Sequence, residues 1–377
     1  MTNRERLVIT LRREIPDCVP VMPDISNMIP ARLTGKPFWD LYLYNDPPIW
    51  EAYLAAARYF DLDVLMDGYF PLSFPEEWAG SPPRERFIIK RTPERIITQA
   101  SYVENGKRIW APTVDIYYIA DPPTAGLPPA KIGLPPEPES WEPLEGVKPV
   151  DVGPEGFKRF KEKLGNQGLI GAFVTYSAAL YDEASIVDYY ENPEKWERAT
   201  EQRITAAEQR FARIMTMEEK PDFICVGGSG TLVFQTPEIF RKLAFPSVKR
   251  AIDLATEAGL YTHLHSCGPE KELVKIMAEE SNLTIIDPLE IPPMGDCDLA
   301  ELKRLYGDKL LLKGNLHTTQ TMLYGSVEDV IAASKKAIDE GAKGGGFVLS
   351  TGDQCGRDTP FENLHAMVET ARTYGKY

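Results

Sequence analysis

A histidine and a cysteine lie two residues apart in one β-type run, and another cysteine follows much later in the chain. His265 and Cys267 belong to the segment Tyr261–Gly268, and Cys355 lies in a Gly-Asp-Gln-Cys-Gly sequence. One imidazole and two thiols that meet at one point form a three-ligand zinc site with an open fourth position. Such open sites are catalytic, because a structural zinc is closed by four protein ligands. The pattern predicts a metal enzyme.

Residue parity indicates which of these side chains share a face. His263, His265 and Cys267 alternate to the same side of a strand, and the residues nearest its carboxyl end reach the mouth of a barrel. We therefore expect His265 and Cys267 to be ligands, and His263 to be a core or supporting histidine one layer deeper. Cys355 follows the last predicted strand, on the same rim. A lone cysteine is more often an inert core residue. The prediction of a metal site therefore rests on the positions of these residues at the ends of strands.

Eight short apolar runs alternate with amphipathic stretches, which is the pattern of βα units around a parallel sheet. We predict one α/β domain over residues 1–377, a (β/α)8 TIM barrel with its active site at the carboxyl ends of the strands. The expected strands are 19–22, 63–66, 169–174, 223–226, 262–265, 283–286, 310–313 and 346–349. The clearest helical patterns are 193–217, 237–258, 271–280, 327–340 and 360–374.

One segment, residues 80–150, interrupts this alternation between the second and third strands. Its first part predicts an antiparallel β-meander with a tight hairpin at Asn105-Gly106. The following stretch, 121–149, holds nine prolines and is expected to lack regular structure. Two placements of this excursion remain open: over part of the barrel mouth, or against a second copy of the chain in a homodimer.

The composition restricts the partners. The chain has 56 acidic and 42 basic residues and a formal charge of −14, which argues against nucleic acid or an anionic membrane surface. No run approaches the roughly 20 apolar residues that span a bilayer, and the first residues lack the features of a signal peptide. Five unpaired cysteines suit a reducing compartment. We expect a cytoplasmic enzyme that acts on a small molecule.

The residues after the early strands predict a substrate pocket rich in methionine and aromatic side chains, which suits an apolar or aromatic substrate. The glycine-rich loop Gly227–Gly230 lacks the lysine of a phosphate-binding loop, so we interpret it as a loop that lets a substrate approach the backbone. The candidate substrate-binding residues are Met22, Asn27, Met28, Tyr69, Phe70 and Tyr176.

From about the fourth predicted strand to the end, several segments of the chain resemble the uroporphyrinogen decarboxylase superfamily. The most specific are Asp298–Lys303, Lys313–Leu316, Gly344–Leu349 and Thr359–Leu364. Within that superfamily, His-x-Cys after the fifth strand and Cys-Gly after the eighth are similar to the zinc motif of the branch that moves methyl groups to or from corrinoid proteins. The resemblance implies a TIM barrel, with His265, Cys267 and Cys355 as zinc ligands.

The decarboxylases of this superfamily carry an arginine-rich segment after the first strand, which holds the carboxylates of a tetrapyrrole. Here that place is Met22–Met28, which has no positive charge. A substrate with many carboxylates would be repelled. The resemblance therefore implies a methyltransferase, with a separate corrinoid-binding protein as its partner, because the chain shows no motif that holds a cobalamin itself.

The expected reaction is O-demethylation of a methoxylated aromatic, with cobalt(I) of the corrinoid as the nucleophile. Zinc would act as a Lewis acid on the ether oxygen as the C–O bond breaks. Glu290 and Asp353 are the candidate catalytic carboxyls, because either can complete the zinc shell at rest or protonate the leaving phenolate.

Three alternatives remain open. One imidazole and two thiolates cancel the +2 charge of zinc, which suits thiols at least as well as ethers, so the first is a corrinoid-dependent methyltransferase acting on a thiol or methylated thiol. The second is a metal-free lyase like uroporphyrinogen decarboxylase. The third is a non-catalytic barrel that binds a corrinoid partner.

Overall fold

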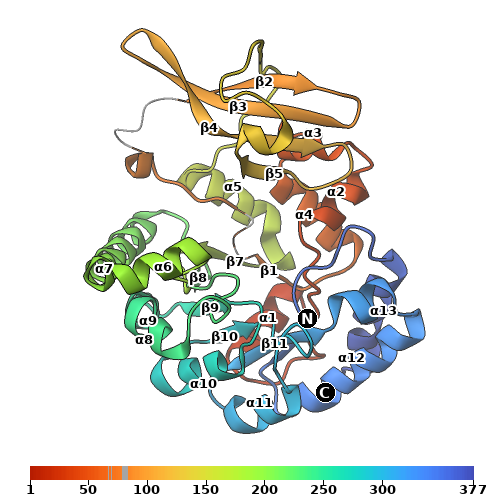
Figure 1. Ribbon diagram of the computed structural model, residues 1–377. Coiled ribbons are helices and arrows are strands. Elements are labelled where there is room, and N and C mark those ends of the chain that lie inside the picture. The colour runs from red at the N-terminus through yellow and green to blue at the C-terminus, as the bar shows by residue number, and fades with distance from the viewer. Residues whose placement is uncertain (67, 69, 79–83) are drawn as a thin grey trace. The chain divides into compact units, whose positions relative to one another are not determined.

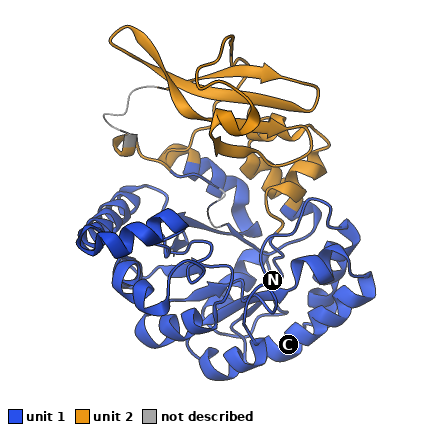
Figure 2. Ribbon diagram, in the orientation of Figure 1, with its two compact units in different colours: residues 1–24, 57–72, 157–377 blue, residues 25–56, 73–156 orange. Residues whose placement is uncertain are grey.

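Seven parallel strands form the sheet of the larger of two compact units (Figures 1 and 2). This computed structural model describes residues 1–66, 68, 70–78 and 84–377, and the larger unit comprises residues 1–24, 57–72 and 157–377. Each of the last seven predicted strands overlaps one observed strand. In chain order, which is also their order in the sheet, these are β1 (Val64–Met66), β7 (Gly168–Phe173), β8 (Phe223–Cys225), β9 (Tyr261–His265), β10 (Ile285–Asp287), β11 (Leu311–Leu316) and β12 (Phe347–Thr351).

The first predicted strand, 19–22, is reduced to a short connection that joins the two edges of this sheet. Val21 forms a parallel bridge with Leu349 of β12. The carbonyl of Val21 also accepts a hydrogen bond of 3.0 Å from the amide of Asp63, just before β1. Because Pro20 and Pro23 lack N–H groups, a longer ladder cannot form here. The connection completes the ring, and the predicted (β/α)8 fold is confirmed.

Apart from α1, which precedes the strands, helices surround the sheet of the larger unit (Figure 1). The expected helix 237–258 is wrong as a single element: it is divided at Ala244, because Pro246 cannot donate to a preceding turn. No helix in the described ranges is long and apolar enough to cross a membrane. The helices are α1 (Asn3–Leu11), α5 (Pro154–Leu164), α6 (Glu183–Glu191), α7 (Pro193–Thr216), α8 (Pro237–Leu243), α9 (Phe245–Glu257), α10 (Lys271–Glu280), α11 (Leu299–Tyr306), α12 (Val327–Gly341) and α13 (Phe361–Thr373).

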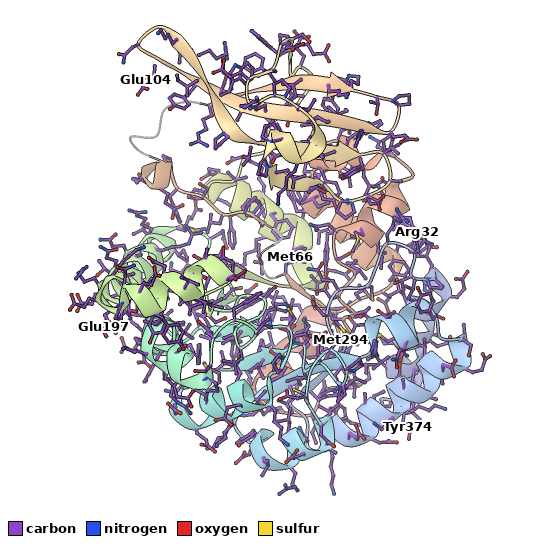
Figure 3. All side chains as sticks on the ribbon, viewed as in Figure 1. Arg32, Met66, Glu104, Glu197, Met294 and Tyr374 are labelled. Atoms are coloured by element: carbon purple, nitrogen blue, oxygen red, sulfur yellow. The ribbon has the colours of Figure 1, made fainter. Side chains whose placement is uncertain are left out.

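The smaller unit, residues 25–56 and 73–156, contains an antiparallel sheet in the order β5-β4-β3-β2-β6. The meander and its hairpin are confirmed: Asn105 and Gly106 both have positive φ, and Figure 3 labels Glu104 beside this turn. Its elements are α2 (Met28–Thr34), α3 (Phe38–Tyr42), the start of α4 (Ile49–Tyr59), β2 (Glu85–Arg91), β3 (Arg95–Glu104), β4 (Lys107–Tyr118), β5 (Thr124–Leu127) and β6 (Glu142–Pro143).

The proline-rich stretch 121–149 is more regular than expected. It contributes β5 and β6 to the two edges of the sheet, together with a short 3-10 helix at Pro129–Ile132. The expectation of no regular structure is therefore wrong. Edge strands tolerate proline because one side of each strand needs no N–H donor. The organisation of residues 1–377 as one domain stays a prediction.

Helix α1 packs into the interior of the barrel. Its residues Leu7 and Leu11 belong to one buried cluster with apolar side chains from the strands, among them Leu65, Phe223 and Ile285. A barrel filled in this way is a packed core rather than a pore. The amino-terminal helix therefore supports the strands that carry the candidate site.

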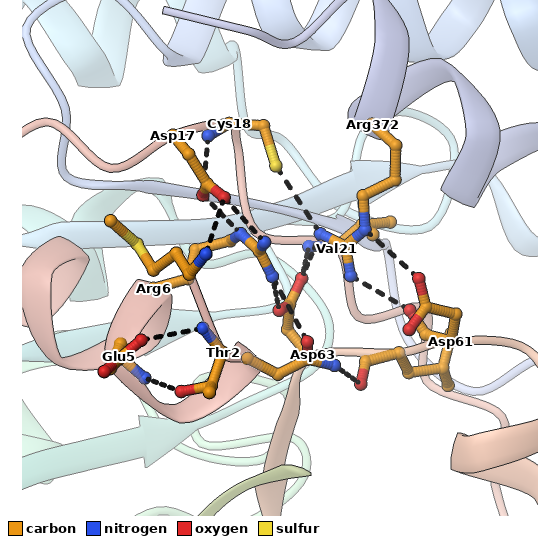
Figure 4. A network of polar contacts seen from close by, with 12 residues as sticks. Thr2, Glu5, Arg6, Asp17, Cys18, Val21, Asp61, Asp63 and Arg372 are labelled. Carbon is orange, nitrogen blue, oxygen red and sulfur yellow. Dashed lines mark hydrogen bonds and ion pairs between the residues drawn. The ribbon is translucent and has the colours of Figure 1, made fainter. Parts of the chain in front are cut away.

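Asp63 lies just before β1 and is fully buried, with 0% of its surface exposed. Its Oδ1 accepts a hydrogen bond of 2.7 Å from Arg6 of α1, and its Oδ2 accepts one of 2.8 Å from Arg372 of α13 (Figure 4). The amide of Val21 also donates to Oδ2 at 2.8 Å. A buried charge is costly unless it is paired. This carboxylate therefore ties the first and last helices to the place where the barrel closes.

Arg372→Met is expected to lower the free energy of unfolding by about 3 kcal/mol, because the buried Asp63 loses one of its two arginine partners. Urea denaturation measures this change. Arg241→Gln is the control, since it removes surface ion pairs with Glu272 and Glu280 and should cost less than about 1 kcal/mol. Equal, small effects of both changes would contradict the role assigned to Asp63.

Candidate metal centre

Strand β9 carries two histidines that alternate along its length, His263 and His265, and Cys267 follows shortly after its end. Strand β10 lies beside it in parallel, in a register that places Asp287 opposite His265. The two predicted ligands therefore lie at the carboxyl end of β9, the end at which barrels of this kind carry their active sites.

Asp287 is the centre of a buried polar network that joins three adjacent strands. Its Oδ1 lies 2.9 Å from His263 Nε2 and 3.2 Å from His265 Nδ1, and its Oδ2 accepts from the ammonium of Lys313 in β11. Burial alone would raise the pKa of the Asp287 carboxyl, but Lys313 and the two imidazoles outweigh burial and hold the pKa well below its usual range. Asp287 is therefore an ionised carboxylate.

The charge of Asp287 determines the tautomer of His265. An ionised carboxylate only accepts hydrogen bonds, so His265 donates through Nδ1–H and its Nε2 keeps the lone pair. That Nε2 lies 3.9 Å from Oδ1 of Asp353. A carboxylate that accepts from the other ring nitrogen is the usual support of a zinc-binding histidine. His263 directs its Nε2 to Asp287 instead, which is consistent with the supporting role expected for it.

Cys267, Glu290 and Asp353 meet next to His265. One ligand atom from each of these three residues lies within 4.8 Å of the other two. Glu290 is buried and accepts a hydrogen bond of 2.5 Å from the amide of Gly268. Burial, followed by the charge of Asp353, raises the pKa of the Glu290 carboxyl. Asp353 has a φ of 106°, in the left-handed region that favours glycine. These side chains fit a divalent cation, because sulfur, imidazole and carboxylate donors are all ligands of zinc.

Cys355 is placed differently from the other two predicted ligands. It is completely buried, and its amide donates a hydrogen bond of 2.8 Å to the carbonyl of Asp24. Burial and the charge of Asp24 raise the pKa of its thiol, against hydrogen bonds with Thr351 and Thr359. Within the described ranges, the group whose ligand atoms lie within 4.8 Å of one another contains Cys267 and the two carboxylates, but neither His265 nor Cys355. The roles of His265 and Cys355 as ligands stay predictions.

Two of the predicted substrate-binding residues lie in apolar packing. Met22 belongs to the cluster inside the barrel, where its sulfur accepts from the amide of Leu65 at 3.1 Å. Phe70 packs against Phe157 and Phe160, with ring centroids 5.7 and 5.5 Å away. Both side chains are buried, and neither lines a described cavity.

The other predicted substrate-binding residues are spread over the two units. Asn27 precedes α2 in the smaller unit, and Met28 packs there against helices α2 and α3. Tyr69 lies outside the described residues. Tyr176 follows β7, is 62% exposed and stacks on Phe173, with ring centroids 5.4 Å apart. Tyr176 also lines a cavity of about 570 Å³ at the carboxyl end of the strands.

Asp287 directly follows the sixth predicted strand, 283–286, but sequence reasoning assigned it no partner. It named Lys313 only as part of a family motif. The signal that could have joined them is their common position near the ends of adjacent strands, where an acid, a base and two histidines cannot be buried without pairing. The register of these neighbouring strands was the missing fact.

A model of the uroporphyrinogen decarboxylase (URO-D) family matches residues 158–374, more than half of the chain. The chain therefore belongs to the URO-D family, and the resemblance seen in the sequence is confirmed. The match begins before β7, earlier than the sequence motifs indicated. A solved methyltransferase from Methanosarcina mazei has the same fold: it aligns with 99% of each chain at a TM-score of 0.62 and 19% identity.

Curated relatives match over a shorter segment. The chain is 30% identical over 139 residues to the methylcobamide:CoM methyltransferase MtbA of Methanosarcina mazei, which is 36% of this chain and 37% of that protein. It is 27% identical over 141 residues to the methylcobamide:CoM methyltransferase MtaA of Methanosarcina barkeri, 37% of this chain and 38% of that protein. The matched segments thus span little more than a third of these relatives.

Asp287→Asn is expected to weaken zinc binding by about 10- to 100-fold, because the amide no longer holds His265 in its ligand tautomer. Competition with a chromogenic chelator measures the affinity, and a melting curve checks the fold. Asp308→Asn, which changes an exposed carboxylate, is the control and should bind zinc as the parent does. An unchanged affinity in Asp287→Asn would show that His265 is not a ligand.

Proposed function

We propose that this protein is a zinc-dependent methyltransferase that moves a methyl group from a methoxylated aromatic to cobalt(I) of a corrinoid held by a partner protein. The carrying observation is the position of His265, oriented by the buried carboxylate of Asp287, next to Cys267. Both lie at the carboxyl end of a barrel of the URO-D family. Relatives named methylcobamide:CoM methyltransferases support a corrinoid as the second reactant.

His265 through Nε2, together with the thiolates of Cys267 and Cys355, would hold the zinc. When bound, zinc supplies Lewis acidity that stabilises negative charge on the leaving atom of the methyl donor. The protein prepares this set through Asp287, which accepts from His265 Nδ1 and is itself neutralised by Lys313. Cys355 lies in a buried setting that keeps its thiol protonated in the absence of a cation, so binding of the cation would release a proton.

Glu290 and Asp353 are proposed as the catalytic carboxyls. Their positions within 4.8 Å of Cys267 allow either to occupy the fourth ligand position at rest. The other carboxyl, in its protonated form, would lie beside the leaving oxygen. As the C–O bond breaks, its electron pair would stay on oxygen, and the nucleophilic cobalt(I) would supply the electron pair of the new bond to the methyl carbon. Protonation of the phenolate by this carboxyl completes the demethylation.

A methoxylated aromatic is the first candidate donor because of the cavity beside the site. Tyr176 and Tyr181 line it, and both are more than half exposed. Flat aromatic side chains at an open cavity favour contact with another ring. The cavity of about 570 Å³ is in the usual range for a small-molecule site, about 300–1,000 Å³.

A thiol is the second candidate substrate, with the same residues and the same partner. The relatives that match this chain are named for CoM, and an imidazole with two thiolates cancels the charge of zinc. Such a neutral set suits a thiolate ligand well.

Cys267→Ser is expected to reduce bound zinc from roughly one ion per chain to far less and to abolish methyl transfer. Elemental analysis measures the zinc, and a cobalt(I) corrinoid assay measures the transfer. Cys18→Ser is the control, because Cys18 is a buried cysteine that lies beside Arg372, and it should keep both properties. A parent protein without zinc would favour the metal-free lyase.

Cys355→Ser tests the third ligand separately. Loss of zinc and turnover is expected. If zinc stays bound at the parental affinity, Glu290 or Asp353 holds it in place of Cys355. If turnover is also undiminished, Cys355 has no part in the reaction.

Assays with each class of methyl donor separate the two candidate functions. With a corrinoid protein reduced to cobalt(I), methoxylated aromatics are expected to give methylcobalt, which the absorbance spectrum reports. Methylated thiols are tested in parallel, and free thiols are tested in the reverse direction against methylcobalt. Turnover with thiols alone would replace the first candidate by the second.

A further inference from the structure

Arg203 is a half-buried arginine on helix α7. Its guanidinium donates to the carbonyls of Ala178 and Tyr176. In the part of the chain that the structure describes, no carboxylate lies within ion-pair distance of it. Arg250 on the neighbouring helix α9, in contrast, forms an ion pair of 2.6 Å with Glu208. Burial lowers the pKa of the Arg203 guanidinium, because no nearby carboxylate offsets its loss of water.

This guanidinium lines the cavity of about 570 Å³ at the carboxyl ends of β7 and β8. The walls are largely apolar or aromatic, with Val174, Tyr176 and Tyr181 on one side. The loop residues Gly228 and Ser229 form another side. A Cβ at Gly228 would lie 3.4 Å from the ring of Tyr176, so glycine leaves this space open. Arg203 is the one charged group that the cavity wall contains among the described residues.

The cavity borders the strand that carries the predicted zinc ligands. The amide of Gly228 donates a hydrogen bond of 2.7 Å to the carbonyl of His265. A Cβ at Gly227 would lie 2.2 Å from the amide nitrogen of His265, so only glycine allows the loop to approach so closely. On the same side, Thr231 donates its amide to Ser266 Oγ at 3.1 Å. One wall of the cavity, at Gly228, is therefore hydrogen-bonded directly to the backbone of β9.

A partly dehydrated guanidinium without a counter-ion gains most from an anionic ligand. Its fork of N–H donors matches carboxylate and sulfonate oxygens, and its two hydrogen bonds to carbonyls fix its orientation. The chain as a whole has a formal charge of −14, which repels anions at long range. Anion recognition here must therefore come from local contacts.

We propose that Arg203 and the Gly227–Gly230 loop form a subsite for the acidic group, a carboxylate or a sulfonate, of the small molecule that exchanges its methyl group at this site. The inference rests on the proposed function for the identity of the reaction, but the subsite itself is a binding property of the protein. It narrows the substrate class to anions: a methoxylated aromatic acid, or a thiol that bears a sulfonate.

Calorimetric titration of the full-length protein tests this subsite without any methyl transfer. The probes are two pairs that differ in charge: 4-methoxybenzoate against 4-methoxybenzyl alcohol, and 2-mercaptoethanesulfonate against 2-mercaptoethanol. In the parent, each anion should bind more tightly than its neutral counterpart. Arg203→Gln should weaken binding of the anions by about 10- to 100-fold and leave the neutral probes within about twofold. The pair with the larger effect identifies whether a carboxylate or a sulfonate is the preferred group.

Three further variants serve as controls for the proposed subsite. Arg198→Gln removes an exposed charge from the same helix and should leave all affinities unchanged. Arg203→Lys keeps the charge but loses the fork, so it should weaken the anions less than Arg203→Gln does. Ala206→Leu fills the cavity from an exposed position of α7 with a residue that favours helix. It should weaken both members of each pair even if Arg203→Gln fails to fold.

The subsite is overturned if the parent does not prefer the anions, if Arg203→Gln weakens neutral and anionic probes equally, or if Ala206→Leu has no effect. Failure of the proposed function has a different signature. In that case methyl transfer or stoichiometric zinc is absent, while the preference for anions in the titrations persists.

Discussion

The candidate site depends on one buried carboxylate. Asp287 is 1% exposed, and an ion at such a depth is tolerated only if its partners replace the water that it has lost. Lys313 on one side and two histidines on the other supply them. Because these partners come from β9 and β11, the three strands must keep one relative register. The contacts of Asp287 that orient His265 therefore also stabilise the barrel interior.

The two ends of the barrel have different roles. At one end, Asp63 joins α1, α13 and the short connection at Val21 through charge-assisted hydrogen bonds. At the other end, the carboxyl groups of Glu290 and Asp353 lie close to the thiol of Cys267. This division is characteristic of (β/α)8 barrels, in which one face of the barrel provides stability and the other carries the chemistry. Residues near the carboxyl ends of the strands are therefore free to serve binding.

Periodicity and spacing predicted much of the fold. The alternation of apolar runs and amphipathic stretches located seven strands, and parity assigned His265 and Cys267 to one rim. Four features were beyond it. The pairing of Asp287 with Lys313 depends on the register of neighbouring strands. The placement of Cys355 depends on the path of the loop after β12. Arg203 lies on a helix, so a search restricted to strand ends could not find it. The edge strands β5 and β6 of the smaller unit were not predicted, because the high proline content argued against any strand. Edge strands tolerate proline.

The backbone of Asp353 has a further consequence. Its φ of 106° is a conformation that a side chain with a Cβ adopts at an expense of about 1–3 kcal/mol, whereas glycine enters it freely. Glycine at this position would remove the backbone strain. The aspartate instead places a carboxyl group beside Cys267 in a loop whose backbone is strained. Tolerance to substitution at this position should consequently be judged by ligand chemistry rather than by folding.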